Sequence, residues 1–414
     1  MNMKNYLLTL AMLLTMSMAS ASCGDDEPAK PDSRLTDPTE TTDTTATQPG
    51  TEKEDPTGGT PDSPAATVKC FVGGDISMLS KYEEQKAAYK DRDGNAISNM
   101  LDFLKQQGWN TMRVRLFVDP SKSGDKGVCQ DLDYVKKLGA RIKKAGLLFM
   151  LDFHYSDTWA DPGKQWTPTA WLHMDDTQMA AQIYSYTREC LNELKAAGAT
   201  PDLIQTGNEI SYGMLWGEEN TQANRCYTNS PAANWNRFFN LLKQAGKACR
   251  EVCPQAKIII HSERVPKPDV LIDFFDRIKA VQLDYDIIGL SYYPYFHGSL
   301  NALETALSRI EQKNYGKNIQ IVETGYPLRW AIGNDYDYTK VYPYTEEGQR
   351  HFTADLVALL KKHTLVNGLS WWYAEANAKG CTGNLSSGWY NASLFDNETG
   401  RALPALYEID SSKW

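Results

Sequence analysis

From residue 68 to the C-terminus, short apolar runs alternate with amphipathic stretches of ten or more residues. Short apolar runs bounded by glycine or proline are typical of buried parallel strands, and apolar residues spaced three and four apart are typical of helices. Eight such repeats over about 350 residues predict an α/β protein, a (β/α)8 TIM barrel with enlarged loops after its strands. An open doubly wound sheet is the alternative. It normally has fewer units and a glycine-rich phosphate-binding turn after its first strand, which Gly73-Gly74 does not supply.

Three of the predicted helices end at a glycine, as helices do when a left-handed residue caps them: Gly108, Gly146 and Gly198. We expect strands at residues 69–72, 111–118, 147–153, 203–206, 257–260, 287–291, 319–322 and 369–373. We expect helices at residues 97–107, 132–145, 178–197, 234–252, 270–280, 300–314, 347–363 and, as a short closing helix, 403–407.

The N-terminus has the sequence features of an export signal. Lys4 precedes an apolar run at 6–18, and small residues then lead to Cys23. This layout predicts a secretory signal at 1–22 that ends in a bacterial lipoprotein cleavage site, with Cys23 taking the lipid. Ser20 stands where that site usually has leucine, so an ordinary signal peptide with an incidental cysteine is the alternative.

Residues 23–66 are rich in Thr, Pro, Asp, Glu and Gly, a composition that predicts a disordered tether. Residues 24–66 hold eleven acids and three bases, and so all but one unit of the chain's net charge of −9. The remaining domain, 67–414, is close to neutral, which argues against a nucleic-acid partner. The acidic cluster after Cys23 resembles the surface-export signal of Bacteroidota lipoproteins, and predicts a lipid-anchored protein on the outer face of the outer membrane. We expect this protein to be a monomer.

The other seven cysteines match no zinc pattern, because Cys249 and Cys253 lack a second pair of ligands at metal-site spacing. An odd number leaves at least one thiol free. We expect buried free cysteines, with room for one disulfide.

Two glutamates follow apolar strands directly. Glu209 follows Asn208 after the strand at 203–206, and Glu323 ends the strand at 319–322. A retaining glycosidase needs one carboxylic acid and one carboxylate nucleophile about 5 to 5.5 Å apart. We assign Glu209 as acid/base, Glu323 as nucleophile and Asn208 as a partner of the sugar 2-hydroxyl. Arg115, with Arg113 second, is the guanidinium expected to lower the pKa of Glu323.

Other polar and aromatic residues crowd the predicted strand ends. Asp152, Asp161, Glu263 and Glu375 are rival carboxylates, of which Asp152 lies inside an apolar strand and is better suited to a buried structural role. His154 and His261 are either core histidines or residues that contact substrate or orient a glutamate. Eight tryptophans fall in loops or at the rim, where about half would stack on sugar rings and suggest internal cleavage of a polymer: Trp159, Trp166, Trp171, Trp216, Trp330, Trp371, Trp372 and Trp389.

The motif Asp152-Phe-His-Tyr-Ser-Asp-Thr-Trp-Ala-Asp-Pro162, with Gly207-Asn-Glu-Ile210 and Val322-Glu-Thr324, resembles glycoside hydrolase family 53. These are the arabinogalactan endo-β-1,4-galactanases of clan A. Supporting segments run in order from about residue 71 to 406: 74–77, 113–116, 292–294, 343–349 and 394–396. The resemblance implies a retaining endo-hydrolase of β-1,4-galactan that needs no cofactor for its chemistry. The other expected substrate contacts are Arg115, His154, Asp157, Trp159, Asp161, His261, Tyr293, Trp372 and Trp389.

The sequence departs from the family in two places. Some bacterial relatives hold a structural calcium between the loops after the last two strands. Asp335 and Asp337 resemble part of that ligand run, but Thr339 and Val341 stand where further ligands are expected, which leaves calcium open. The family's Trp-Glu-Pro-Ala-Trp pattern is altered at 372–376, which changes the expected subsites there.

Two other functions remain open. One is the same machinery acting on another β-linked glucan or mannan. The other is a surface lipoprotein that binds glycans without cutting them, for which loss of one glutamate would be the sign. Both glutamates are present.

Overall fold

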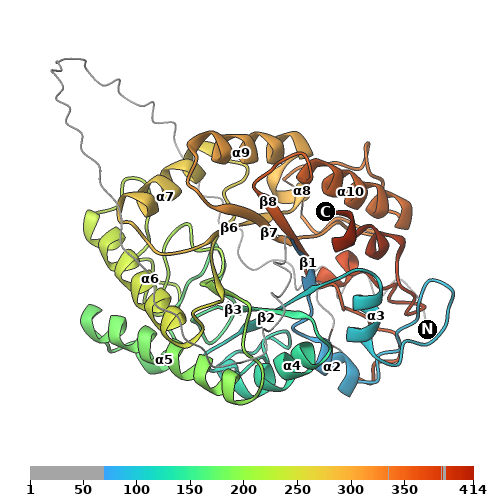
Figure 1. Cartoon of the computed structure of the whole chain (residues 1–414), viewed down its shortest axis with the longest axis horizontal. Helices are drawn as coiled ribbons and strands as arrows, with labels where there is room; N and C mark the ends of the chain where they lie inside the picture. The colour runs from blue at the N-terminus through green and yellow to red at the C-terminus, as the bar shows by residue number, and fades with distance from the viewer. Residues whose placement is uncertain (1–69, 334, 384, 386–387) are drawn as a thin grey trace, which may run out of the picture. The chain divides into compact units, whose positions relative to one another are not determined.

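The computed structural model describes residues 70–414, apart from 334, 384, 386 and 387. Eight parallel strands pair in sequence order, and β8 closes on β1 (Figure 1). The predicted barrel is confirmed. The predicted signal, tether and lipid-bearing Cys23 lie outside the described residues.

The strands and helices alternate as expected. The strands are β1 (Phe71–Asp75), β2 (Thr111–Leu116), β3 (Leu148–Phe153), β4 (Leu203–Thr206), β5 (Lys257–Ser262), β6 (Ile287–Tyr292), β7 (Asn318–Thr324) and β8 (Val366–Trp371). The helices are α2 (Leu79–Glu84), α3 (Met100–Gln106), α4 (Leu132–Lys144), α5 (Asp176–Ala196), α6 (Ala232–Val252), α7 (Pro268–Ala280), α8 (Pro294–His297), α9 (Leu300–Lys313) and α10 (Glu346–Leu360).

Three differences from the sequence prediction concern short elements. The first strand runs later than 69–72 and the last begins earlier than 369–373. Helices α2 and α8 were not predicted, because six and four residues are too few to show a helical period. The closing helix expected at 403–407 is a 3₁₀ helix, Pro404–Glu408.

Side-chain caps fix where four of the helices begin. Asn99, Asp131 and Thr345 accept backbone N–H groups in the first turns of α3, α4 and α10. Asp175 and Gln178 form a reciprocal capping box at the start of α5. Such caps satisfy donors that have no partner within the helix, and each contributes about 1 kcal/mol.

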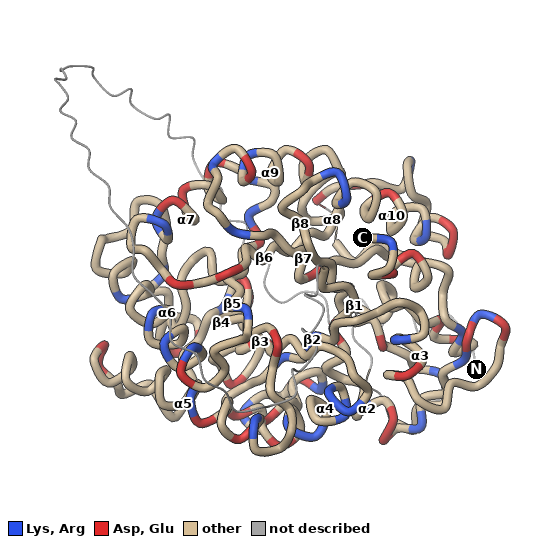
Figure 2. Tube along the Cα trace, viewed as in Figure 1, with Lys and Arg blue, Asp and Glu red and all other residues tan. Residues whose placement is uncertain are grey.

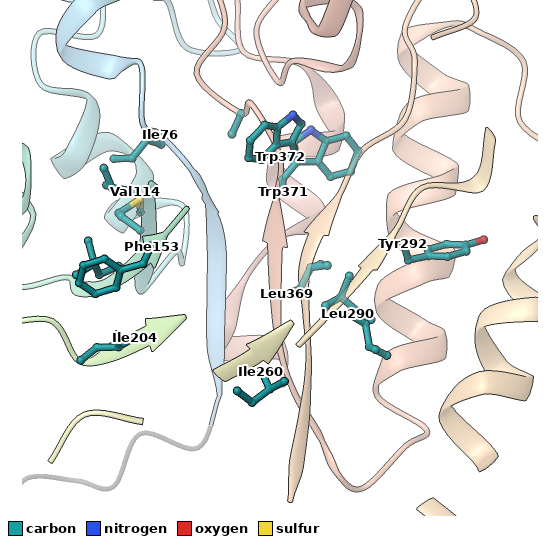
Figure 3. Packing of buried hydrophobic residues seen from close by; sticks show 14 of the residues in the cluster. Ile76, Val114, Phe153, Ile204, Ile260, Leu290, Tyr292, Leu369, Trp371 and Trp372 are labelled. Atoms are coloured by element: carbon teal, nitrogen blue, oxygen red, sulfur yellow. The ribbon is translucent and has the colours of Figure 1, made fainter. Parts of the chain in front are cut away.

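Successive side chains along each strand point alternately out of the barrel, toward the helices, and into the barrel interior. Outward-facing residues pack against the helices, as Val114, Ile204 and Leu369 do in Figure 3, and are almost fully buried. Inward-facing residues fill the barrel in two levels. The lower level is apolar and consists of Met150, Leu203, Ile259, Ile287 and Val322.

Two residues further along the same strands, the interior becomes polar. Asp152, Gln205 and His261 of β3, β4 and β5 point into the barrel toward the C-terminal ends of the strands, together with Arg113 of β2, and none is exposed. Buried polar groups are costly unless they are hydrogen-bonded to one another. The upper interior is therefore a connected network, and the functional site lies on top of it.

The surface of the barrel domain carries mixed charge. Figure 2 shows basic and acidic residues interspersed along the outer helices α5, α6, α7 and α9. All seven cysteines from Cys70 to Cys381 are free. Within the described part of the chain, no helix has the length and apolar character needed to span a membrane.

Candidate active site

Glu209 stands three residues beyond the last residue of β4, in a backbone conformation that is rare for a residue with a side chain. Its φ is 48°, in the left-handed region, and Gly207 before it has a φ of 111°. The Glu209 N–H donates to Nδ1 of His261 across 3.2 Å, which helps to hold this conformation. Strain of this kind persists only where the surroundings enforce it, and it concentrates at functional sites.

A three-residue hydrogen-bonded chain orients the Glu209 carboxyl. Because Nδ1 of His261 accepts the N–H of Glu209, the proton of the neutral ring lies on Nε2. That Nε2–H donates to Oγ of Ser291 across 2.8 Å, and the Ser291 hydroxyl donates to Oε1 of Glu209 across 2.6 Å. His261 is fully buried, and burial lowers its pKa well below the usual value, which keeps the ring neutral.

Glu323 lies within β7, where the pairing register with β6 shifts at Leu290 and Ser291. Its Oε1 accepts from the Arg113 guanidinium at 2.8 Å, and its Oε2 accepts from the Tyr293 hydroxyl at 3.0 Å. Both carboxylate oxygens are therefore held. This fixes the direction in which a nucleophile at this position would point.

Arg113 connects the site to the barrel interior. Besides Glu323, its guanidinium donates to Asp75 (3.1 Å), Asp152 (2.8 Å) and the side-chain oxygen of Asn208 (3.0 Å). The expectation that Arg115 is the main partner of Glu323 is wrong. Arg115 points away from it and donates to Asp75 and to the carbonyl of Gly127.

The two glutamates differ in how strongly they hold a proton. Burial raises the pKa of Glu209 well above its usual value, and the carboxylates of Glu323 and then Glu263 raise it further. Burial also raises the pKa of Glu323, to about 7, although Arg113 and the Tyr293 hydroxyl oppose the rise. When two buried carboxylates interact, the proton stays on the one with the less favourable charged form. That one is Glu209.

Both glutamates line one cavity of about 440 Å³, a size common for small-ligand sites. Aromatic rings and acidic groups dominate its wall. The lining residues are Trp159, Ala160, Asp161, Pro162, Lys164, Asn208, Glu209, Glu263, Tyr293, Phe296, His297, Glu323, Trp372 and Trp389. They come from the loops that follow β3 to β6 and β8, and from β7 itself, so the cavity opens at the C-terminal end of the barrel.

The sequence of residues 71–409 matches glycosyl hydrolase family 53. The chain belongs to this family. It is therefore a glycoside hydrolase built on a (β/α)8 barrel.

Relatives of this hydrolase share most of its length. The arabinogalactan endo-beta-1,4-galactanase of Cellvibrio japonicus is 32% identical over 354 residues, which cover 81% of this chain and 89% of that protein. The probable arabinogalactan endo-beta-1,4-galactanase A of Neosartorya fischeri is 32% identical over 346 residues, covering 78% and 91%. The solved GH53 catalytic domain of Ignisphaera aggregans is 33% identical, with a TM-score of 0.72 and coverage of 83% and 96%.

Six of the expected substrate contacts line the cavity of the hydrolase: Trp159, Asp161, Asn208, Tyr293, Trp372 and Trp389. The other four are absent from its lining. Arg115 and His261 are fully buried. His154 accepts the backbone N–H of Ala160 at 3.0 Å, and Asp157 accepts the N–H groups of Asp119 and Thr169. These four residues support the cavity from behind its wall.

Three of the eight tryptophans, Trp159, Trp372 and Trp389, line the cavity. Their rings contact one another edge to face, with Trp372 at the centre, 6.0 Å from Trp159 and 6.2 Å from Trp389. Trp171, Trp216 and Trp371 are core residues, and Trp330 is exposed. Aromatic faces packed in this way offer an apolar surface to the C–H face of a sugar ring.

The candidate calcium ligands form no metal site among the described residues. Asp335 and Asp337 are exposed, and Oδ1 of Asp337 already accepts from the backbone and hydroxyl of Thr339. No group of three His, Cys, Asp or Glu side chains suited to a metal ion occurs in the described part of the chain. Two such carboxylates fall short of the six to eight oxygens that calcium takes. Calcium stays an untested prediction, and no catalytic step below relies on it.

Sequence reasoning missed Ser291 as the group that orients Glu209, and missed Lys164, Phe296 and His297 in the cavity wall. Ser291 could have been noticed, because it stands near the C-terminal end of β6 and directly before Tyr292 and Tyr293. Lys164 lies in a loop, and Phe296 and His297 lie in the four-residue helix α8; the sequence pattern determines the path of neither segment.

Proposed function

We propose that this family 53 hydrolase is a retaining endo-β-1,4-galactanase that cuts internal bonds of the galactan side chains of pectin and releases galactooligosaccharides. One observation carries the mechanism: Glu209 and Glu323 share a cavity, and of the two only Glu323 accepts from Arg113. The substrate class is supported by the names of relatives that match over most of their length.

In the first step, Glu323 attacks the anomeric carbon as the glycosidic bond breaks, and Glu209 gives its proton to the departing oxygen. The raised pKa of Glu209 keeps that proton available near neutral pH. Arg113 and the Tyr293 hydroxyl hold the Glu323 carboxylate in place while its negative charge is lost to the new ester bond.

In the second step, Glu209 is a carboxylate and takes a proton from water, whose oxygen attacks the anomeric carbon and releases Glu323. The Ser291 hydroxyl stabilises the ionised form of Glu209 at this stage. Asn208 is anchored through Arg113 and the carbonyl of Ala160, so its amide is positioned to meet the sugar 2-hydroxyl in both steps.

Glu323→Gln tests this function. The amide keeps the size of the side chain but is no nucleophile, so galactooligosaccharide release from linear galactan should fall by at least about 10³-fold. Galactan binding should persist. The exposed Glu251→Gln, on the outer surface of α6, is the matched control and should keep wild-type activity.

Three results would contradict the proposal. Undiminished release by Glu323→Gln would remove the catalytic assignment. If the wild-type enzyme degraded only cellulose or mannan when these were assayed beside galactan, the family machinery would act on another polymer. Galactan binding without hydrolysis by the wild type would favour the non-catalytic glycan-binding function.

The predicted export signal supports a further part of the proposal: the enzyme is anchored by a lipid on Cys23 to the outer face of the outer membrane, where it meets long galactan. We propose that it acts there as a monomer. Cys23→Ser should move the protein from the membrane fraction to the medium or periplasm. A Cys23→Ser protein that fractionates with membranes as the wild type does would contradict the anchor.

A further inference from the structure

Glu263 is a further carboxylate of the cavity wall and has no role in the two catalytic steps. It directly follows β5 and is about 5% exposed. It lines the same cavity as Glu209 and Glu323. A buried carboxylate in a site that already holds three others, Glu209, Glu323 and Asp161, is unfavourable, so the position requires a physical reason.

The contacts of Glu263 use only one of its oxygens fully. Oε2 accepts from the Ser211 hydroxyl at 2.9 Å. Oε1 lies 2.9 Å from Nε of Arg264, yet both atoms are buried without a hydrogen-bond partner, since the N–H does not point at the oxygen. Arg264 therefore supplies compensating charge, and Oε1 still has its acceptor capacity.

Glu263 lies on the side of the cavity from which the leaving group departs. Ser211, which holds Glu263, comes two residues after Glu209 on the same loop. The partners of Glu323 are other groups: Arg113 and Tyr293. Because Glu209 gives its proton to the departing oxygen, the departing sugar lies on the Glu209 side of the cavity. Of the two remaining carboxylates in the cavity wall, Glu263 has a larger electrostatic effect on Glu209 than Asp161 has.

We propose that Glu263 binds a hydroxyl group of the sugar on the leaving side of the scissile bond and so selects a galactosyl unit there. This inference rests on the proposed function. A carboxylate that accepts a hydroxyl makes a charge-assisted bond, and a sugar that leaves this oxygen unpaired is disfavoured. Glu263 is a specificity residue, whereas Glu209 carries the proton.

Glu263 could also act through the proton affinity of Glu209, so the test must separate the two effects. A nitrophenyl β-1,4-galactobioside forms the covalent intermediate on Glu323 with no sugar on the leaving side. Added galactobiose then competes with water for the intermediate. In either case the attacking oxygen bonds to the anomeric carbon, the ester to Glu323 breaks, and the proton passes to Glu209. Any effect on Glu209 therefore cancels in the ratio of transfer product to hydrolysis product.

Glu263→Gln should lower that ratio about 10-fold or more, the loss expected for a hydrogen bond to a charged group. Glu251→Gln should keep the wild-type ratio. An unchanged ratio in a folded Glu263→Gln enzyme would overturn the inference.

Ser211→Ala is the second variant, for the case in which Glu263→Gln does not fold. It keeps the charge but removes the hydroxyl that positions Glu263, so it should lower the ratio by a smaller factor, and a wild-type ratio would overturn the inference. The proposed function fails separately, if wild-type enzyme releases no oligosaccharides from galactan.

Discussion

Replacing Glu323 with Gln should stabilise the barrel at neutral and alkaline pH even though it removes the nucleophile. Burial raises the pKa of Glu323 from 4.5 to about 7. The folded protein therefore binds this proton more tightly than the unfolded chain does. As pH rises from about 4.5 to about 7, the unfolded chain loses the proton first, so the free energy of unfolding falls. Gln has no proton to lose and avoids this decrease.

The size of the effect follows from the same shift. A change from 4.5 to about 7 corresponds to about 3 kcal/mol, at about 1.4 kcal/mol per pKa unit. For a barrel of roughly 350 residues the unfolding entropy is about 0.7 kcal/mol/K, so the melting temperature at pH 8 should rise by about 4 °C. At pH 4, where Glu323 is protonated in both states, the two proteins should differ little.

Urea unfolding of wild type and Glu323→Gln between pH 4 and pH 8.5 measures this difference directly. The two stability curves should separate as pH rises, with the variant above the wild type. Glu251→Gln, an exposed change of the same kind, should run parallel to wild type throughout. Parallel curves for Glu323→Gln as well would show that burial does not raise the proton affinity of Glu323.

Three further perturbations test the network around the cavity. Arg113→Gln removes the guanidinium that opposes protonation of Glu323, so the acid limb of the pH profile of kcat/KM should move to higher pH. An acid limb that stays in place would contradict this. The variant should also lose about 3 kcal/mol or more of its free energy of unfolding, because buried carboxylates are left unpaired. Ser291→Ala removes a hydrogen bond that favours ionised Glu209, so the alkaline limb should move to higher pH, whereas a shift to lower pH would contradict that role. EDTA tests the calcium prediction for Asp335 and Asp337: a decrease of several degrees in the melting temperature that calcium reverses would show a metal site, and an unchanged melting temperature would contradict one.

The barrel could be predicted because its signals are local. Strands such as 111–118 and 287–291 are short apolar runs between breakers, and glycines such as Gly108 mark helix ends in the sequence itself. Placing Glu209 and Glu323 at one end of the barrel then needs only the rule that the C-terminal ends of parallel strands meet.

Finer assignments failed where they depend on distances between strands. Arg113 and Arg115 lie on the same face of β2, and the sequence does not say which of the two reaches Glu323. The register of β2 places Arg113 opposite Asp75 and Met150, one level deeper than Arg115. From there its guanidinium reaches across the barrel to β7. Glu263 was considered as a rival carboxylate, but its position could not be predicted from the sequence, because the path of a loop is determined by tertiary contacts.

The charge balance around Arg113 has a consequence for how this scaffold could change. Arg113 and Arg115 already neutralise Asp75 and Asp152, so Glu323 is a surplus anion in the barrel interior. A descendant that lost Glu323 would retain an electrically balanced interior and an intact sugar-binding surface. Selection for hydrolytic activity alone would therefore preserve Glu323. A single codon change would be enough to convert the enzyme into a stable protein that, like a lectin, binds sugars without cutting them.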